Sequence, residues 1–199
     1  MSDRITIDPE HDALIVVDVQ NDFCPGGALA VPEGDKVIVP LNRLLHLQWC
    51  TIVGTRDWHP ANHHSFKAQG GPWPPHCVRE TAGAEFHPAL KSATFQKIIS
   101  KGVTSEDPGY SAVEGTTLVP YLLEHGVKRV FVGGLATDYC VKATVIDLLR
   151  EGLDVFVLTD AVRGVNVDPA DSRKALGAMQ GDGATLIEST HVQPDTKHH

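Results

Sequence analysis

The sequence lacks the features that mark several classes of protein. No apolar run in its 199 residues approaches the roughly 20 residues that a membrane-spanning helix needs. Residues 1–5 contain no basic segment followed by an apolar core, so they do not resemble a secretory signal. The four cysteines (Cys24, Cys50, Cys77 and Cys140) include no C-x-x-C pair and do not suggest a disulfide framework. We therefore expect a reduced, cytoplasmic setting.

Basic residues are also few. The chain has 17 Lys and Arg against 25 Asp and Glu, which gives a formal net charge of -8. The basic residues are scattered, whereas a nucleic-acid-binding protein would gather them in a patch or stripe. No G-x-G-x-x-G or G-x-x-x-x-G-K-[ST] motif follows an apolar run, so a dinucleotide or P-loop site has no support. Binding of a small neutral molecule remains compatible with this composition.

Apolar runs alternate with amphipathic stretches. Strands are predicted at residues 13–19, 51–55, 95–100, 130–133, 154–159 and 184–187, and helices at 37–47, 117–124, 137–150 and 169–179. This alternation predicts a three-layer α/β/α, Rossmann-like fold with a mostly parallel central sheet. We expect a single domain over residues 1–199 that ends in a polar tail, 193–199. The loop at 56–94, rich in Pro, Gly, His and Trp, is long enough to suggest a functional segment.

A cysteine follows a glycine turn in the segment GGLATDYCV, residues 133–141. The segment predicts a strand, a tight turn and then the first turn of a helix that carries Cys140. A helix N-terminus offers unpaired N–H groups and the positive end of the helix dipole, which lower the pKa of a thiol. This favours a nucleophile, and the alternative is a buried structural thiol.

Two charged residues are expected at the same edge of the sheet as Cys140. Asp18 lies at the end of the first predicted strand and Lys101 follows the third, and sites in open α/β sheets form at the carboxyl ends of the strands. Buried there, Asp18 would be a general base whose pKa is raised, or else a cap or salt-bridge partner. Lys101 would stabilise the anions beside it, or else be a solvated surface residue.

The long loop contains candidate metal ligands. Asp57 and His59 are two residues apart on an extended segment, so their side chains share a face. Together with His76, which follows two prolines, they would leave coordination positions open, as catalytic metal sites do. The spacing does not decide whether His63 or His64 is a ligand, a second hydrogen-bonding partner or a solvated side chain.

Two aromatic residues, Phe23 and Trp73, lie in loops beside these groups. Either could belong to the core. Aromatic side chains on loops can also sandwich a flat ring, which favours a role for both in a substrate pocket.

Six blocks of this sequence resemble a known family: DVQNDF (18–23), RDWHPANHHSF (56–66), GGPWPPHCV (70–78), KG (101–102), YS (110–111) and GLATDYCV (134–141). From residue 12 to about residue 187 the chain resembles the nicotinamidases (pyrazinamidases) of the isochorismatase-like cysteine hydrolase superfamily. The Asp, Lys and Cys residues are shared across that superfamily. The D-W-H and W-P-x-H-C blocks are similar to the nicotinamidase branch in particular.

The resemblance implies a catalytic triad of Asp18, Lys101 and Cys140. It also implies a cis peptide bond between Leu135 and Ala136, with the N–H groups of Ala136 and Cys140 forming an oxyanion hole. Leu135 departs from the Val or similar residue expected there.

The resemblance further implies a divalent metal ion, zinc or else iron or manganese. Its ligands would be Asp57, His59 and His76, with His63 or His64 as a further ligand. The substrate-binding residues would be Phe23, Trp73, Leu135 and Tyr110, with Phe23 and Trp73 on either side of the pyridine ring.

The implied reaction is hydrolysis of nicotinamide to nicotinate and ammonia through a cysteine thioester, a step of NAD salvage, with pyrazinamide also accepted. The implied partner is this small molecule, with no nucleic acid and no membrane, and formation of a homo-oligomer stays open. Three alternatives remain: an amidohydrolase of the superfamily acting on a carbamoyl compound or small aliphatic amide, a non-catalytic ligand- or metal-binding module, and a hydrolase that uses a metal-bound water.

Overall fold

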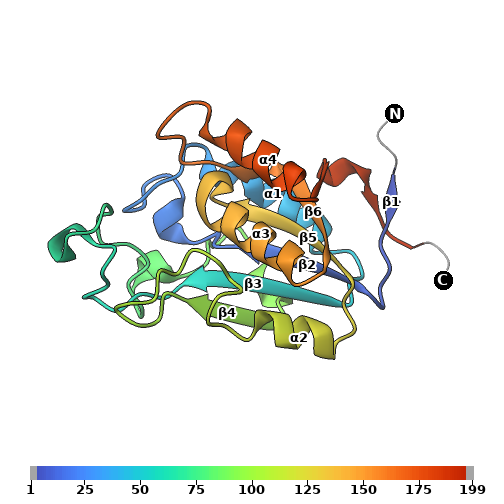
Figure 1. Cartoon of the computed structure of the whole chain (residues 1–199), viewed down its shortest axis with the longest axis horizontal. Helices are drawn as coiled ribbons and strands as arrows, with labels where there is room; N and C mark the ends of the chain where they lie inside the picture. Colours follow the sequence, from blue (N-terminus) through green and yellow to red (C-terminus); the bar gives the residue numbers. More distant parts are fainter. Residues whose placement is uncertain (1–3, 196–199) are drawn as a thin grey trace.

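The computed structural model describes residues 4–195 and has a parallel sheet at its centre (Figure 1). The strands are β2 (Asp12–Val17), β3 (Thr51–Asp57), β4 (Lys97–Lys101), β5 (Arg129–Leu135), β6 (Asp154–Arg163) and β7 (Thr185–Ile187). They lie in the order β4-β3-β2-β5-β6-β7, and every neighbouring pair is parallel. A separate parallel pair joins β1 (Ile5–Thr6) to β8 (Val192–Gln193), so Gln193 lies in a strand where a polar tail was expected. The predicted parallel sheet is confirmed.

Helices cover both faces of this sheet. They are α1 (Ile38–Leu44), α2 (Leu118–Glu124), α3 (Lys142–Arg150) and α4 (Asp171–Gly181). All six residues of β2 are buried, and successive side chains of a strand point to opposite faces. Leu14 thus belongs to the same apolar cluster as Leu41 of α1, whereas Ile15 belongs to the cluster that contains Leu148 of α3 and residues of α2 and α4. The three-layer prediction is therefore confirmed.

Two predicted helices differ from the observed ones. The helix expected at 37–47 is α-helical only over Ile38–Leu44 and is preceded by a 3-10 turn at Gly34–Val37. The helix expected at 137–150 begins with a π-helical turn, Thr137–Val141, before α3. The wider turn forms because the carbonyl of Ala136 accepts the N–H of Val141, five residues along the chain. Single π-turns of this kind are frequent at functional sites.

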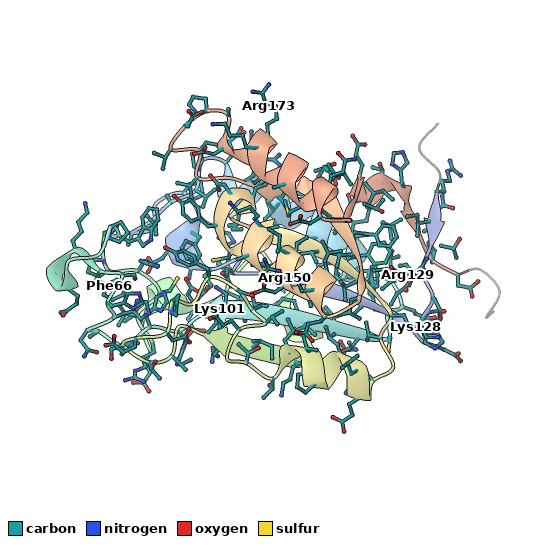
Figure 2. All side chains as sticks on the ribbon, in the orientation of Figure 1. Phe66, Lys101, Lys128, Arg129, Arg150 and Arg173 are labelled. Carbon is teal, nitrogen blue, oxygen red and sulfur yellow. The ribbon has the colours of Figure 1, made fainter. Side chains whose placement is uncertain are left out.

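The order of the strands reverses at β2, which lies between β3 and β5. Ligands of open α/β sheets bind at such a switch point, outside the carboxyl ends of the strands. The segment between β3 and β4, teal to green in Figure 1, projects from this end. Figure 2 places Lys101 at this end and Arg129 near the opposite one, where Arg129 pairs with Asp12. Among residues 4–195, no helix has both the length and the apolar character that crossing a membrane requires.

Candidate active site

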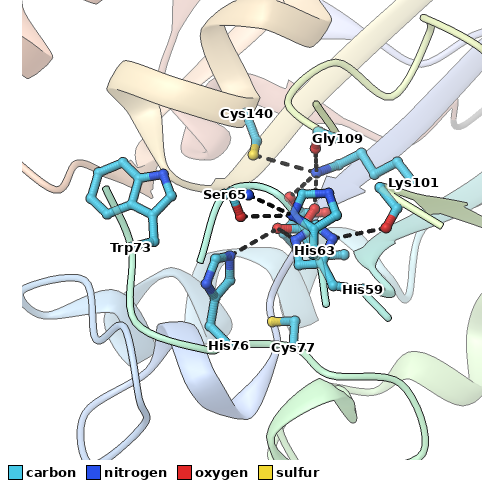
Figure 3. Close-up of polar contacts among 12 residues, drawn as sticks. His59, His63, Ser65, Trp73, His76, Cys77, Lys101, Gly109 and Cys140 are labelled. Carbon is cyan, nitrogen blue, oxygen red and sulfur yellow. Dashed lines mark hydrogen bonds and ion pairs between the residues drawn. The ribbon is translucent and has the colours of Figure 1, made fainter. Parts of the chain in front are cut away.

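Lys101 connects the charged groups at the carboxyl end of the sheet. It is the last residue of β4 and is fully buried. Its Nζ lies 2.6 Å from Oδ2 of Asp18 and 3.4 Å from Sγ of Cys140, and it pairs with Oδ1 of Asp57 (Figure 3). It also donates a hydrogen bond to the carbonyl of Gly109 at 2.6 Å. The fold thus brings Asp18, Lys101 and Cys140 into one buried cluster.

Asp18 has one carboxylate oxygen held and one available. It follows β2 with a left-handed backbone (φ 49°), and its Oδ1 accepts the hydroxyl of Thr55 at 2.7 Å. Oδ2 is ion-paired with Lys101 but accepts no hydrogen bond of good geometry from any residue in the described range. Burial raises the pKa of Asp18, and the charge of Lys101 opposes this only in part. A carboxylate with a raised pKa is suited to accept a proton from a neighbouring thiol.

The pKa of Cys140 departs from the expectation. The thiol was expected to have a lowered pKa, but burial raises its pKa well above the usual value. Lys101 acts in the opposite direction, and the nearby carboxylates of Asp18 and Asp57 reinforce the rise. The prediction of a lowered pKa is therefore wrong, because desolvation and the two carboxylates outweigh the charge of Lys101. A thiol with a raised pKa depends on a neighbouring base to become a nucleophile.

Asp57, His59 and His76 form a compact group of metal-ligand type. Asp57 ends β3, and its Oδ2 lies 3.2 Å from Nε2 of His59 and 3.8 Å from Nε2 of His76. One ligand atom from each residue lies within 4.8 Å of the other two, and all three residues are buried. The predicted shared face of Asp57 and His59 is confirmed.

Hydrogen bonds orient both histidines toward this point. Nδ1 of His59 donates to the carbonyl of Gly102 at 2.9 Å, and Nδ1 of His76 donates to that of Pro74 at 2.8 Å. Because a carbonyl only accepts, the Nε2 atoms are left facing Asp57, as in metal sites whose outer partners fix the tautomer. Burial lowers the pKa of His76, whereas at His59 the bond and charge of Asp57 outweigh burial and raise the pKa. The donor set thus fits a divalent cation.

The adjacent histidines His63 and His64 make contacts that differ from those of His59 and His76. Nε2 of His63 donates to the carbonyl of Asp107 at 2.7 Å, and its Nδ1 lies 2.7 Å from the hydroxyl of Ser65, so both ring nitrogens are engaged. The ring stacks on His59 at 4.0 Å between centroids. His64 is exposed and donates to a backbone carbonyl. This geometry favours His63 as a support for His59 over a further ligand.

A pocket with about 400 Å³ of empty space, open solvent at its mouth included, lies between the cysteine and the metal-ligand group. Its lining includes eight residues named from the sequence: Phe23, Asp57, Trp73, His76, Tyr110, Leu135, Ala136 and Cys140. Four further residues complete it: Leu29, Val31 and Val165, which lie outside the quoted blocks, and Tyr139, which lies in the block at 134–141 but was given no role.

The aromatic residues of the cavity are held by one another. The indole N–H of Trp73 donates to the hydroxyl of Tyr110 at 3.1 Å, and its ring meets that of Tyr139 edge-on at 5.3 Å. The ring of Phe23 lies 5.6 Å from that of His76. An apolar cavity with a few convergent polar groups suits a small flat ligand.

The segment that leads to Cys140 has the predicted backbone. The peptide bond between Leu135 and Ala136 is cis, which confirms that prediction. Ala136 and Cys140 both line the cavity.

Sequence reasoning missed two residues that hold the site. Gln20, fully buried, donates to the carbonyl of Asp57 and accepts its N–H, both at 2.8 Å. Asp22 accepts the N–H of Cys77 at 2.8 Å and so fixes the segment that carries His76. Both belong to the DVQNDF block, so the motif was visible although these roles were not.

All the residues of this site lie within a segment that matches one protein-family model. The Isochorismatase domain model matches residues 12–191. The chain belongs to the isochorismatase family. Proteins with similar sequences and structures include ones named nicotinamidase or pyrazinamidase.

The nicotinamidase of Escherichia coli (strain K12) is 43% identical over an alignment 200 positions long, which covers 87% of this chain and 93% of that protein. The structure of PnC1 from L. infantum in complex with nicotinate has a TM-score of 0.92 and 36% identity, covering 96% of this chain and 100% of that one. The pyrazinamidase of Pyrococcus horikoshii, crystallised in complex with zinc, has a TM-score of 0.82 and 48% identity, covering 89% and 99%. This isochorismatase family member therefore resembles nicotinamidases and pyrazinamidases over most of its length.

Proposed function

We infer that this protein is a nicotinamidase, an amidohydrolase that converts nicotinamide to nicotinate and ammonia and also accepts pyrazinamide. The observation that carries the inference is one aromatic-lined cavity with Cys140 on one side and a metal-ligand group on the other. The 43% identity to a nicotinamidase and the neighbouring structure with nicotinate support the same substrate. A place in NAD salvage follows from this reaction. Both core clusters are built on one sheet, which supports a single domain.

Substrate binding is assigned to the cavity walls. Phe23 and Trp73 would contact the faces of the pyridine ring, with Leu135 and Tyr110 beside it. Asp57, His59 and His76 would hold a divalent ion, zinc by analogy with the Pyrococcus horikoshii protein. When bound, this ion would supply Lewis-acid chemistry for the ring nitrogen. His63 would support His59 by stacking.

The chemical steps are assigned to the buried cluster. Asp18 takes the proton of the Cys140 thiol while Lys101 stabilises the resulting negative charge. The sulfur then bonds to the carboxamide carbon, and the amide oxygen becomes an oxyanion. The N–H groups of Ala136 and Cys140 are proposed to stabilise it, and losing one such donor typically costs about 2.7–4 kcal/mol of transition-state stabilisation.

When the adduct of Cys140 with the carboxamide breaks down, Asp18 gives up the proton that it took from the thiol. Asp18 protonates the leaving nitrogen, the C–N bond breaks, and ammonia departs to leave a thioester on Cys140. Water then attacks the thioester carbon while Asp18 accepts one of its protons. The C–S bond breaks, the Cys140 sulfur regains the proton held by Asp18, and the product acid ionises to nicotinate by giving its remaining proton to the released ammonia or to solvent. The raised pKa of Asp18 suits a group that both accepts and donates in one cycle.

Ammonia release from purified, zinc-loaded protein tests this function. We expect turnover of nicotinamide and pyrazinamide, and little turnover of benzamide, which has the same shape without the ring nitrogen. A carbamoyl compound and a small aliphatic amide serve as comparison substrates. Faster release from either of these than from nicotinamide would assign the protein to another amidohydrolase of the family.

A further inference from the structure

A short loop after β4 supplies a backbone acceptor to each half of the site. The carbonyl of Gly102 accepts Nδ1 of His59 at 2.9 Å, and the carbonyl of Gly109 accepts Nζ of Lys101 at 2.6 Å. The orientation of a metal-ligand histidine and that of the buried lysine therefore both depend on the shape of residues 102–109.

One side chain of this loop, Asp107, holds both of these glycines. Its Oδ2 accepts the N–H of Gly102 at 2.8 Å, and its Oδ1 accepts the N–H of Gly109 at 3.0 Å. Its own backbone carbonyl accepts Nε2 of His63 at 2.7 Å, and the ring of His63 stacks on His59. Hydrogen bonds to a carboxylate are stronger than those between neutral groups, so Asp107 holds Gly102 and Gly109 more strongly than a neutral side chain would.

The two glycines explain why the loop can lie so close to the imidazole of His59. Both have positive φ, 62° at Gly102 and 73° at Gly109. A Cβ on Gly102 would lie 2.3 Å from Cε1 of His59, and one on Gly109 would lie 2.9 Å from Cα of Gly102. Glycine tolerates this approach but has many other conformations open to it, so an external anchor must select this one.

We propose that Asp107 is a positioning residue that orients His59 and Lys101 together through the carbonyls of Gly102 and Gly109. The inference rests on the proposed function, since it takes His59 as a metal ligand and Lys101 as part of the catalytic cluster. Asp107 touches neither group directly. Its removal would release both glycine N–H groups, and the two carbonyls would then no longer be held against the imidazole and the ammonium.

Three variants test this role: Asp107→Ala, Asp107→Asn and, as a control, Glu106→Ala. Glu106 is exposed and has no hydrogen bond or ion pair with another residue in the range 4–195. Zinc affinity of the metal-free proteins is measured by competition with a chromophoric chelator, and kcat and KM for nicotinamide are measured at saturating zinc. Partners beyond the ligands typically contribute 10–100-fold to metal affinity, and Asp107 acts through a carbonyl, so we expect about a tenfold loss in Asp107→Ala.

The lysine side of the proposal predicts a second effect. The kcat of Asp107→Ala should stay lowered at saturating zinc, because added metal restores His59 but not Lys101. The two N–H groups bond different oxygens of Asp107, and in Asn one of these positions is an NH2 group that cannot accept, so Asp107→Asn should fall between Asp107→Ala and the wild type. Glu106→Ala should match the wild type in both measurements.

The proposal is overturned if Asp107→Ala is folded and binds zinc within twofold of Glu106→Ala. If Asp107→Ala does not fold, Asp107→Asn is judged by the same criterion. Wild-type protein that binds zinc but does not hydrolyse nicotinamide would refute the proposed function alone, because the zinc affinities of the variants would still decide the role of Asp107.

Discussion

Replacing Lys101 with methionine should destabilise the protein in a pH-dependent way. The substitution keeps the length of the side chain but removes the only cation that pairs with both Asp18 and Asp57 in the described part of the chain, and all three residues are buried. Breaking a buried ion pair by removing one partner typically costs about 3–5 kcal/mol. Because two carboxylates lose their partner, we expect the upper end of that range near pH 8, a large part of the roughly 5–15 kcal/mol available to a folded protein.

The pH dependence follows from the two carboxylates. In the wild type, burial acts to raise the pKa of Asp57, but Lys101 and His59 outweigh it and the pKa is lowered. In Lys101→Met the largest opposing charge is gone, so burial keeps the pKa of Asp18 above that of the unfolded chain and the pKa of Asp57 rises from its lowered value. The folded variant then binds more protons than the unfolded one, and its stability falls as pH rises through that range. At lower pH the two carboxylates are protonated, and the difference from the wild type shrinks.

Urea denaturation between pH 5 and pH 8 measures this effect. A chelator is included so that a bound metal cation does not neutralise Asp57. The control is Lys97→Met, at the half-exposed start of the same strand, which should change the free energy of unfolding by less than about 1 kcal/mol. A loss in Lys101→Met below 1 kcal/mol, or one that is equal at pH 5 and pH 8, would refute the reasoning.

Three further predictions concern the site. Cys140→Ala should abolish ammonia release while nicotinamide binding, measured by calorimetry, is kept; retained turnover would favour a metal-bound water as nucleophile. His59→Ala should purify with much less metal and show a raised KM, and stoichiometric metal by elemental analysis would refute its assignment as a ligand. Gln20→Leu should leave the buried backbone groups of Asp57 without partners and lower the free energy of unfolding by about 1–3 kcal/mol per unpaired group. The comparison is half-buried Asn21→Ala, which removes one hydrogen bond to the carbonyl of Ala82 and should lower it by only about 1 kcal/mol.

Local patterns in the sequence predicted the fold well because the central strands β2 and β5 are almost continuous apolar runs. Residues 13–17 are buried on both faces, which is the condition that produces such a run. The π-turn at Thr137–Val141 was not predictable, because it depends on a hydrogen bond to Ala136 within a tertiary setting. The pKa of Cys140 was predicted in the wrong direction for a similar reason, since burial is a property of the fold and not of the local sequence.

The candidate site was predictable where its residues stand at strand ends or in dense motifs. Asp18, Asp57 and Lys101 are of this kind. Leu29 and Val165 contribute only an apolar surface from irregular loops, and such residues carry no signal before the chain is folded. Asp107 has none either, because its role is expressed through the backbone of two glycines.

The catalytic cluster and the metal-ligand group share the carboxylate of Asp57, and this limits how mutations can separate their effects. Oδ1 of Asp57 pairs with Lys101, while Oδ2 faces His59 and His76. A cation bound by the histidines would therefore share the negative charge of Asp57 with Lys101. Asp18 would then be the main counter-ion of Lys101. A change at Asp57 would alter metal binding and the charge on Lys101 at once, so it cannot assign an effect to either. Changes at His59 and at Asp18 act on one half each, and comparing them with the Asp57 variant is the way to measure how strongly the metal and the lysine are coupled.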